Sequence, residues 1–328
     1  MTPLFLYASI LYRLNTWQHV AMHEGSRKAV LAAFFANFGI AIAKLVGFFL
    51  TSSASLLAEA GHSLADSGNQ GLLLLGGSRS KKKATGKHPF GFGRERYFWA
   101  FVVALVLFSM GGLFALYEGI QKLVHPHETE GFPIAIGILF LAIALESFSL
   151  HTVVKEARHF KSPTTSWWKF IRTAKQPELP VVLLEDAGAE AGLLLALFGV
   201  IMGHVTGEPR WDAVGSVAIG ILLVVIAIVL AIEMKSLLIG EAASLEDEEL
   251  IRATLIGAPN VMNLIHMRTE HLGPEDVLVA AKIEFAHHLD VPGLARAIDV
   301  AEARLRAAYP RARLIFVEPD VMQPAETL

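Results

Sequence analysis

Six apolar stretches of this 328-residue chain are long enough to cross a lipid bilayer, and they constrain the fold more than any other feature. A helix rises about 1.5 Å per residue, so a hydrocarbon layer of about 30 Å needs roughly 20 apolar residues. Hydrophobic residues make up 53% of the chain and charged residues only 18%, which excludes an ordinary soluble globular protein. We predict a polytopic α-helical membrane protein with six transmembrane helices, near residues 30–50, 54–76, 97–120, 133–153, 181–203 and 212–239.

The loops between these stretches differ in positive charge. Residues 77–96 carry seven Lys and Arg residues and residues 155–175 carry six, whereas the other connections carry one or none. By the positive-inside rule both basic loops are cytoplasmic, so both termini are cytoplasmic too. The first residues lack a basic n-region and a clear cleavage site, so we do not predict a signal peptide. We expect residues 1–29 to be an N-terminal cytoplasmic segment and residues 30–239 the transmembrane domain.

Beyond residue 239 the composition becomes that of a small soluble domain. An acidic helix start with a 3.6-residue apolar spacing, "SLEDEELIRATLI", is followed by two alternating segments, "NLIHMRTEHL" and "VLVAAKIEFA". An amphipathic helix, "VPGLARAIDVAEARLRAAY", and a final strand, "ARLIFVEP", complete the pattern. This order predicts a cytoplasmic α+β domain over residues 240–328, with helices on one face of a sheet.

Composition also limits the kind of function. The chain has no cysteine, which excludes disulfides, thiolate metal sites and cysteine nucleophiles. The formal net charge of -3 does not describe a nucleic-acid binder, so we expect no nucleic-acid partner.

Two of the predicted spans carry ionisable residues at helical spacing. His62 and Asp66 are four residues apart in the second span, and Asp186 and Glu190 are four apart in the fifth, with Glu185 beside them. An aspartate at a helix centre costs roughly 2.5–3.5 kcal/mol on translocon scales, so such residues indicate a functional site. The two pairs lie at comparable depth, because the second helix enters the membrane from outside and the fifth from inside. Together they offer one imidazole and three carboxylates, a ligand set for a divalent first-row transition metal.

An alternative is that these residues only hydrogen-bond neighbouring helices. We favour a metal site, because the excess negative charge is costly in a dry, empty site and should be neutralised by protons when no metal is bound. Metal loading then expels protons, which describes antiport. An intramembrane metalloenzyme needs a richer histidine set, and the HExxH motif is absent from the chain, so we predict that the protein is not an enzyme.

The segments "AEAGHSLADSGNQ" and "HPFGFGRERYFWA" resemble the second-helix motif and the following loop of the cation diffusion facilitator family, proton-coupled exporters of zinc and manganese. The resemblance covers nearly the whole chain. It implies a homodimer, a ferredoxin-like cytoplasmic C-terminal domain, and a transport site shared between the second and fifth helices that rock between inward- and outward-facing states. The segment "LLEDAGAEAG" is more similar to the branch of the mitochondrial zinc transporter, in the solute carrier 30 family.

Residue by residue, His62 and Asp66 match the family's paired ligands on the second helix. Asp186 and Glu190 fall where the fifth helix of the family usually bears His or Asp followed by Asp. An aspartate in place of the fifth-helix histidine removes one nitrogen donor from the site. Zn²⁺ is still the ion we expect first, and Mn²⁺, Fe²⁺ and Cd²⁺ are alternatives. Glu185, Asn37 and Glu146 are possible accessory residues, with helix-packing hydrogen bonds as the alternative role.

Outside the spans, the resemblance marks Arg94 as a cytoplasmic-end cation that pairs near the hinge to the tail, with Glu241 as its candidate partner. A lipid-facing arginine is the alternative. In the tail, the chain matches a metal-binding position of the family only at His266, so we do not expect a full binuclear site. His287 and His288 are weak metal candidates, since a loop with two histidines is more often simply solvated.

These inferences predict a homodimeric secondary transporter, without a cofactor, that exports Zn²⁺ from the cytoplasm in exchange for H⁺. Its partners are a second copy, the lipid bilayer, the divalent cation and protons, and the expected location is a bacterial inner membrane. The alternatives are an exporter of the same fold that prefers Mn²⁺ or Fe²⁺, and a metal-sensing membrane scaffold that transports nothing.

Overall fold

In a computed structural model, the structure describes residues 30–322 except 44, 47–48, 50–53 and 126–131, and it leaves out the side chains of residues 54–62 and 134. The expected N-terminal segment, 1–29, therefore lies outside the described residues. The chain divides into two compact units. One contains the helices up to Ser78 and residues Arg96–Lys235, and the other contains Arg79–Glu95 together with the chain from Ser236 onward. Each unit is described by itself below.

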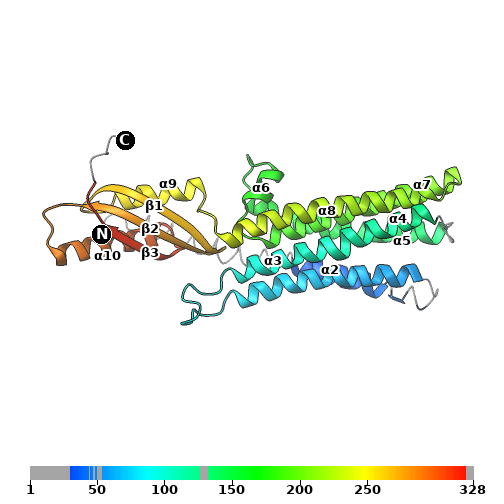
Figure 1. The fold of residues 1–328 in the computed structure, drawn as a ribbon, viewed down its shortest axis with the longest axis horizontal. Helices are drawn as coiled ribbons and strands as arrows, with labels where there is room; N and C mark the ends of the chain where they lie inside the picture. The colour runs from blue at the N-terminus through cyan, green and yellow to red at the C-terminus, as the bar shows by residue number, and fades with distance from the viewer. Residues whose placement is uncertain (1–29, 44, 47–48, 50–53, 126–131, 323–328) are drawn as a thin grey trace. The chain divides into compact units, whose positions relative to one another are not determined.

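The first unit is built from long helices that run side by side (Figure 1). Helices α3, η1 and α4 follow one another without a break, so they form one continuous rod with a π-helical centre. Before these comes a short apolar helix, Val30–Ala43. The labelled helices are α2 (Ala54–Arg79), α3 (Glu95–Val106), η1 (Leu107–Leu113), α4 (Phe114–Val124), α5 (Phe132–Phe160), α6 (Trp167–Thr173), α7 (Glu178–Thr206) and α8 (Arg210–Ile239).

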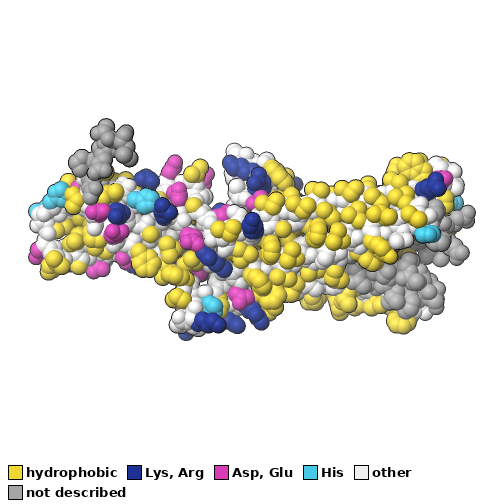
Figure 2. Space-filling model, viewed as in Figure 1, with side chains coloured by type: hydrophobic (Ala, Val, Ile, Leu, Met, Phe, Trp, Pro, Cys, Tyr) yellow, Lys and Arg dark blue, Asp and Glu magenta, His cyan; other side chains and the backbone are white. Residues whose placement is uncertain are grey.

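Three stretches of the described chain are long and apolar enough to cross a membrane: Glu95–Val124, Ala135–Phe160 and Arg210–Ile239. They correspond to the third, fourth and sixth predicted spans. Helices α2 and α7, with 26 and 29 residues, fall on the second and fifth predicted spans, and they are not among these three stretches. The visible surface along the long helices is mostly hydrophobic (Figure 2). The length and composition of the described helices thus support three of the six predicted spans, and the full set of six remains a prediction.

Glycines let helix α8 approach its neighbours closely. A Cβ atom placed on Gly119 of α4 would lie 2.7 Å from the backbone nitrogen of Val217, and one on Gly199 of α7 would lie 2.9 Å from the carbonyl oxygen of Trp211. Contacts this short leave no room for a side chain. Close backbone approach at small residues is how membrane helices gain packing energy, because apolar surfaces are not driven together in lipid.

The predicted order of helices and strands in the tail is confirmed. Helix α9 (Leu245–Ile256) and strands β1 (Val261–Gly273) and β2 (Asp276–Phe285) are followed by α10 (Val291–Ala308) and β3 (Ala312–Pro319). The sheet order is β1-β2-β3, with β1 antiparallel and β3 parallel to β2. Both helices start at a capping side chain, since Ser244 accepts from the Asp247 N–H and Asp290 from the Gly293 N–H.

The core of the tail lies where α9 and α10 meet the sheet. Ile251, Leu255, Val279, Ile283 and Leu305 are completely buried there. Burying such side chains stabilises a fold by about 1.5–3 kcal/mol each. This is the one-sided helix layer that the sequence predicts.

The short helix α6 in the second basic loop was not predicted. Ser166 caps it by accepting a hydrogen bond from the Lys169 N–H, and Phe170 and Ile171 are buried. With seven residues it is too short to leave a helical period in the sequence, which is why the pattern did not reveal it.

Candidate metal site

Four acidic side chains from three helices come together in the first unit. Asp66 lies on α2, Glu146 on α5, and Glu185 and Asp186 on α7. The carboxyl of Asp66 repels those of Glu185 and Asp186 electrostatically, and Glu146 repels Glu185, so the groups share one electrostatic environment. Asp186 is 1% exposed and Glu185 5%. Glu146 is also buried, and Asp66 is half-buried. Ionised carboxylates in such surroundings would attract a cation, because the interior screens charges far less than water does.

Helix α5 supplies hydroxyl groups to two of the predicted ligands. Ser149 Oγ donates to Asp186 Oδ2 over 2.7 Å, and Ser147 Oγ donates to Glu190 Oε1 over 2.8 Å. The other oxygen of Glu190, Oε2, is buried without a hydrogen bond among the described residues. A buried acceptor without a donor is costly, and a bound cation would satisfy it. Neither serine was identified from the sequence, although both follow Glu146 closely in "ESFS".

Two side-chain amides of helix α2 hold the carboxylate of Glu185 on α7. Asn69 Nδ2 donates to Glu185 Oε1 over 2.9 Å, and Gln70 Nε2 donates to Glu185 Oε2 over 3.1 Å. Asn69 is 2% exposed and Gln70 0%. We call this arrangement the amide clamp. The sequence did not predict this arrangement, because adjacent Asn and Gln residues in a helix do not show which residue of another helix they bind.

Two other predicted site residues are less well defined by the structure. His62 belongs to helix α2, one turn before Asp66, but its side chain lies outside the described residues. Asn37 is 3% exposed. Among the side chains that are described, no three His, Asp or Glu residues are arranged to hold a metal ion. The predicted ligand set therefore stays a prediction.

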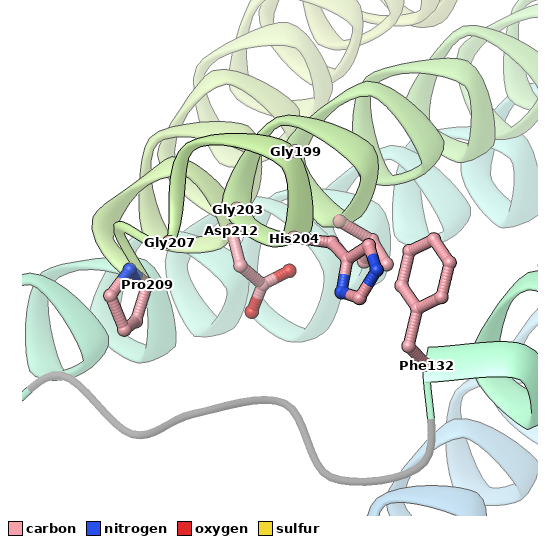
Figure 3. A pocket seen from close by; sticks show the side chains of 8 residues that line it. Phe132, Gly199, Gly203, His204, Gly207, Pro209 and Asp212 are labelled. Carbon is pink, nitrogen blue, oxygen red and sulfur yellow. The ribbon is translucent and has the colours of Figure 1, made fainter.

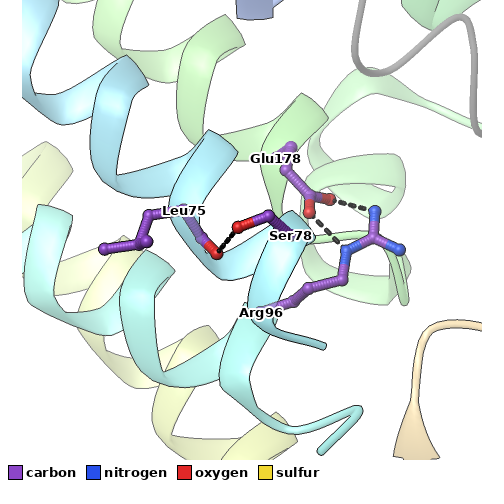
Figure 4. Close-up of polar contacts among 4 residues, drawn as sticks. All are labelled: Leu75, Ser78, Arg96 and Glu178. Atoms are coloured by element: carbon purple, nitrogen blue, oxygen red, sulfur yellow. Dashed lines mark hydrogen bonds and ion pairs between the residues drawn. The ribbon is translucent and has the colours of Figure 1, made fainter. Parts of the chain in front are cut away.

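An ion pair lies at the start of helix α7, seven residues before Glu185. Arg96 of α3 donates through Nε to Glu178 Oε1 and through Nη2 to Glu178 Oε2, the latter over 2.7 Å (Figure 4). The side chains of Arg96 and Glu178 are 7% and 6% exposed. Because the guanidinium donates to both oxygens of Glu178, this is a bidentate ion pair, the geometry that makes such pairs strong.

The second unit gives Arg94 a partner that the sequence did not indicate. The guanidinium of Arg94 pairs with the carboxylate of Glu270 on β1, and both side chains are about 40% exposed. The predicted partner, Glu241, lies near Glu270. The backbone carbonyl of Glu241 accepts a hydrogen bond from the N–H of the residue after Glu270, His271, over 2.8 Å. Arg94 thus bridges to strand β1.

The weak metal candidates of the tail have other partners. Nε2 of His266 accepts a hydrogen bond from Arg268 Nε over 2.9 Å, which occupies the lone pair of that ring nitrogen. Nε2 of His287 lies 3.2 Å from Glu284 Oε1. No three metal-binding side chains come together in the described part of the tail, and this includes His288.

Lys282 of β2 pairs in register with His266 of β1 and belongs to an ion-pair group. Its ammonium lies 2.9 Å from Asp320 Oδ2 and 3.3 Å from Glu318 Oε1. The hydrogen bond from Lys282 lowers the pKa of Asp320, and hydrogen bonds to Asp320 and Glu318 raise the pKa of Lys282.

A pocket of about 210 Å³ lies at the other end of α7 (Figure 3). The ring of His204 stacks on Phe132 with centroids 3.8 Å apart, and Asp212 points into the same space. Lys122 Nζ lies 3.2 Å from Asp212 Oδ2. Fourteen residues of helix separate Glu190 from His204, about 21 Å, so this pocket is distinct from the carboxylate cluster.

Comparison with known proteins gives consistent matches. The family model described as the cation efflux transmembrane domain matches residues 30–239. The mitochondrial proton-coupled zinc antiporter SLC30A9 of Mus musculus is 31% identical over 263 residues, which are 80% of this chain and 46% of that protein. Metal tolerance protein C4 of Arabidopsis thaliana is 28% identical over 80% of this chain and 58% of its own length. Zinc transporter ZitB of Pectobacterium atrosepticum is 27% identical over 79% of this chain and 76% of its own length.

The chain therefore spans only about half the length of the mouse protein. The relatives with a stated activity are named as transporters and antiporters, not as enzymes.

Proposed function

Since the chain belongs to the cation efflux family of metal transporters, we propose that it moves a divalent transition-metal cation, with Zn²⁺ first, out of the cytoplasm in exchange for protons. The observation that carries the proposal is the buried carboxylate cluster between α2, α5 and α7. The names of two relatives, a proton-coupled zinc antiporter and a zinc transporter, support the choice of ion.

The proposed ligands are His62, Asp66, Asp186 and Glu190. The hydroxyls of Ser147 and Ser149 support this set, because a hydrogen-bonded carboxylate keeps one orientation toward the ion. Glu146 and Asn37 are kept as accessory groups, the first because it adds to the charge of the cluster. One nitrogen and three oxygen donors suit Zn²⁺, and the oxygen-rich set is the reason to keep Mn²⁺ and Fe²⁺ as alternatives.

In the proposed cycle, metal and protons compete for the same carboxylates. Metal from the cytoplasm enters when the site faces inward and releases protons, and protons from outside displace the metal when the site faces outward. The change of access is a rocking of helices around a site near the middle of the membrane. His62 would take part in this exchange, because histidine is the side chain that most readily gains and loses a proton near neutral pH.

The proposed topology has six spans: the helix that begins at Val30, α2, the rod α3–η1–α4, α5, α7 and α8. Two basic loops support a cytoplasmic position for residues 77–96 and 155–175, and hence for both termini. We further propose a homodimer in which the ferredoxin-like tail, residues 240–328, takes part in the dimer contact, and a bacterial inner membrane as the location.

The test is metal flux by the purified full chain in proteoliposomes under an imposed pH gradient, with Zn²⁺, Mn²⁺, Fe²⁺ and Cd²⁺ compared. Wild type should move Zn²⁺ fastest and only with the gradient. Asp66→Asn should lose flux by more than the 10–100-fold that loss of a supporting residue costs. Ser67→Ala is the matched control, because this buried hydroxyl of α2 donates within its own helix, to the Ser63 carbonyl.

Flux that ignores the pH gradient would contradict proton exchange. Binding of metal without any flux would instead favour the metal-sensing scaffold.

A further inference from the structure

The three acidic residues of α7 near the site have different partners. Asp186 and Glu190 each accept a hydrogen bond from a serine of α5, which leaves their remaining lone pairs available to an ion. Glu185 accepts an amide hydrogen bond at each of its two oxygens, both from α2. Glu185 is thus the only one of the three for which the structure shows both oxygens engaged.

The amide clamp lies beside the proposed ligands. Asp66, Asn69 and Gln70 are at positions i, i+3 and i+4 of α2, so they share one face of that helix. Glu185 directly precedes Asp186 on α7. Because Glu185 directly neighbours Asp186 and is bonded by side chains one turn from Asp66, releasing the clamp would free its carboxylate to turn toward an ion bound by Asp66 and Asp186.

The clamp has a cost that packing alone does not explain. The amide oxygens Asn69 Oδ1 and Gln70 Oε1 are buried and have no hydrogen-bond donor among the described residues. A buried polar group without a hydrogen-bond partner destabilises the fold. Two such groups are retained at the site, and the visible contribution of these side chains is their N–H donation to Glu185.

We infer that Asn69 and Gln70 are selectivity residues: by holding both oxygens of Glu185 they keep this carboxylate out of the ligand set of the transported ion. The inference rests on the proposed function. A four-ligand nitrogen and oxygen site suits Zn²⁺, which is usually tetrahedral. A further carboxylate would add oxygen donors and raise the coordination number, which suits Mn²⁺ better.

The experiment measures Zn²⁺ and Mn²⁺ affinity and gradient-driven flux for the full chain, in wild type, Asn69→Leu and Gln70→Leu. Each variant removes one donor to Glu185 and should shift the Zn²⁺ to Mn²⁺ preference toward Mn²⁺ by about tenfold, the lower range for loss of a supporting residue. Ser67→Ala, from the same helix, should leave the ratio unchanged. An unchanged ratio in both leucine variants would overturn the inference.

Pairing each variant with Glu185→Gln separates selectivity from a general structural effect. If the amides act through Glu185, then Asn69→Leu should not change the metal preference once Glu185 has been replaced. A shift of the same size in both backgrounds would mean that the amides act in another way, and the inference would fail.

Glu185→Gln also decides the question if the leucine variants do not fold, because glutamine has nearly the same shape. It should lower zinc affinity far less than Asp186→Asn, since only Asp186 is a ligand. An equal loss in the two variants would make Glu185 a ligand and overturn the inference. Failure of the proposed function is distinguishable, since wild type itself would then move neither metal.

Discussion

Helix α7 makes two kinds of contact in the membrane unit. Toward α2, α3 and α5 it presents the carboxylates of Glu178, Glu185, Asp186 and Glu190, which meet amides, a guanidinium and hydroxyls. Toward α8 it presents glycines, where a Cβ on Gly188 would lie 2.6 Å from Ile226 Cδ1 and one on Gly199 would meet backbone. We call these the acidic side and the glycine side.

The difference shows how one helix divides its roles. The acidic side buries charge, which lipid and protein interior both oppose, so every group there needs a partner or an ion. The glycine side gains packing energy from close backbone approach. Substitutions on the two sides should therefore fail in different ways. One variant on each side tests this, and a third variant outside α7 gives the scale.

The largest effect on stability is expected at the buried ion pair of the acidic side. Arg96→Met leaves the carboxylate of Glu178 buried without its cation, which costs about 3–5 kcal/mol in typical buried pairs. Thermal unfolding of the purified protein in detergent measures the loss. Replacing both partners, Arg96→Met with Glu178→Leu, should recover most of it, because no isolated charge remains. If the double variant is as unstable as the single one, the pair is not the cause.

An intermediate effect is expected on the glycine side. Gly199→Val puts a side chain against the backbone of Trp211 and Asp212, which cannot move aside as a flexible side chain would. Overpacking of this kind costs about 1–3 kcal/mol. Gly137→Val on α5 is the matched control, because nothing lies within 4 Å of a Cβ at that position. Equal melting temperatures for the two variants would show that α7 and α8 are not packed this closely.

The smallest effect is expected at an ion pair outside helix α7, which calibrates the first variant. Lys282→Met removes the cation from an exposed group in the tail and should lower the melting temperature far less than Arg96→Met.

The small effect of Lys282 should also depend on pH. Because Lys282 lowers the pKa of Asp320, the stabilisation is present above the ordinary aspartate pKa of about 3.9 and is lost as the pH falls through the lowered value. Melting temperatures measured from neutral to acid pH should therefore converge for Lys282→Met and wild type. A difference that grows in acid would contradict this.

Parts of the fold could be read from sequence because they depend on local patterns. Apolar length predicted the helices over 97–120, 133–153 and 212–239, and the structure has helices at each place. The alternation in "VLVAAKIEFA" predicted β2. The π-helical turn at Leu107–Leu113 was not predicted, because its Gly111 and Gly112 fit both helix types until packing against Leu223 and Val224 of α8 is known.

The candidate site divides in the same way. The cost of charge in a membrane helix was enough to single out Asp66, Asp186 and Glu190, since it applies whatever the neighbours are. The serines of α5, the amide clamp and the partners of Arg94 and Arg96 depend on which helix or strand faces which. Glu241 was chosen for Arg94 by resemblance, and Glu270 is reached because β1 passes beside it.

The sequence by itself determined that this chain is a membrane protein with a small α+β tail, and that ionisable groups on two of its helices deserve a function. These conclusions follow from hydrophobic length, period and the energy of buried charge, which are properties of single segments. Only the tertiary structure decided that Glu185 is held by α2 while Asp186 and Glu190 are held by α5. That division depends on hydrogen bonds between residues more than thirty positions apart, and no local pattern encodes them.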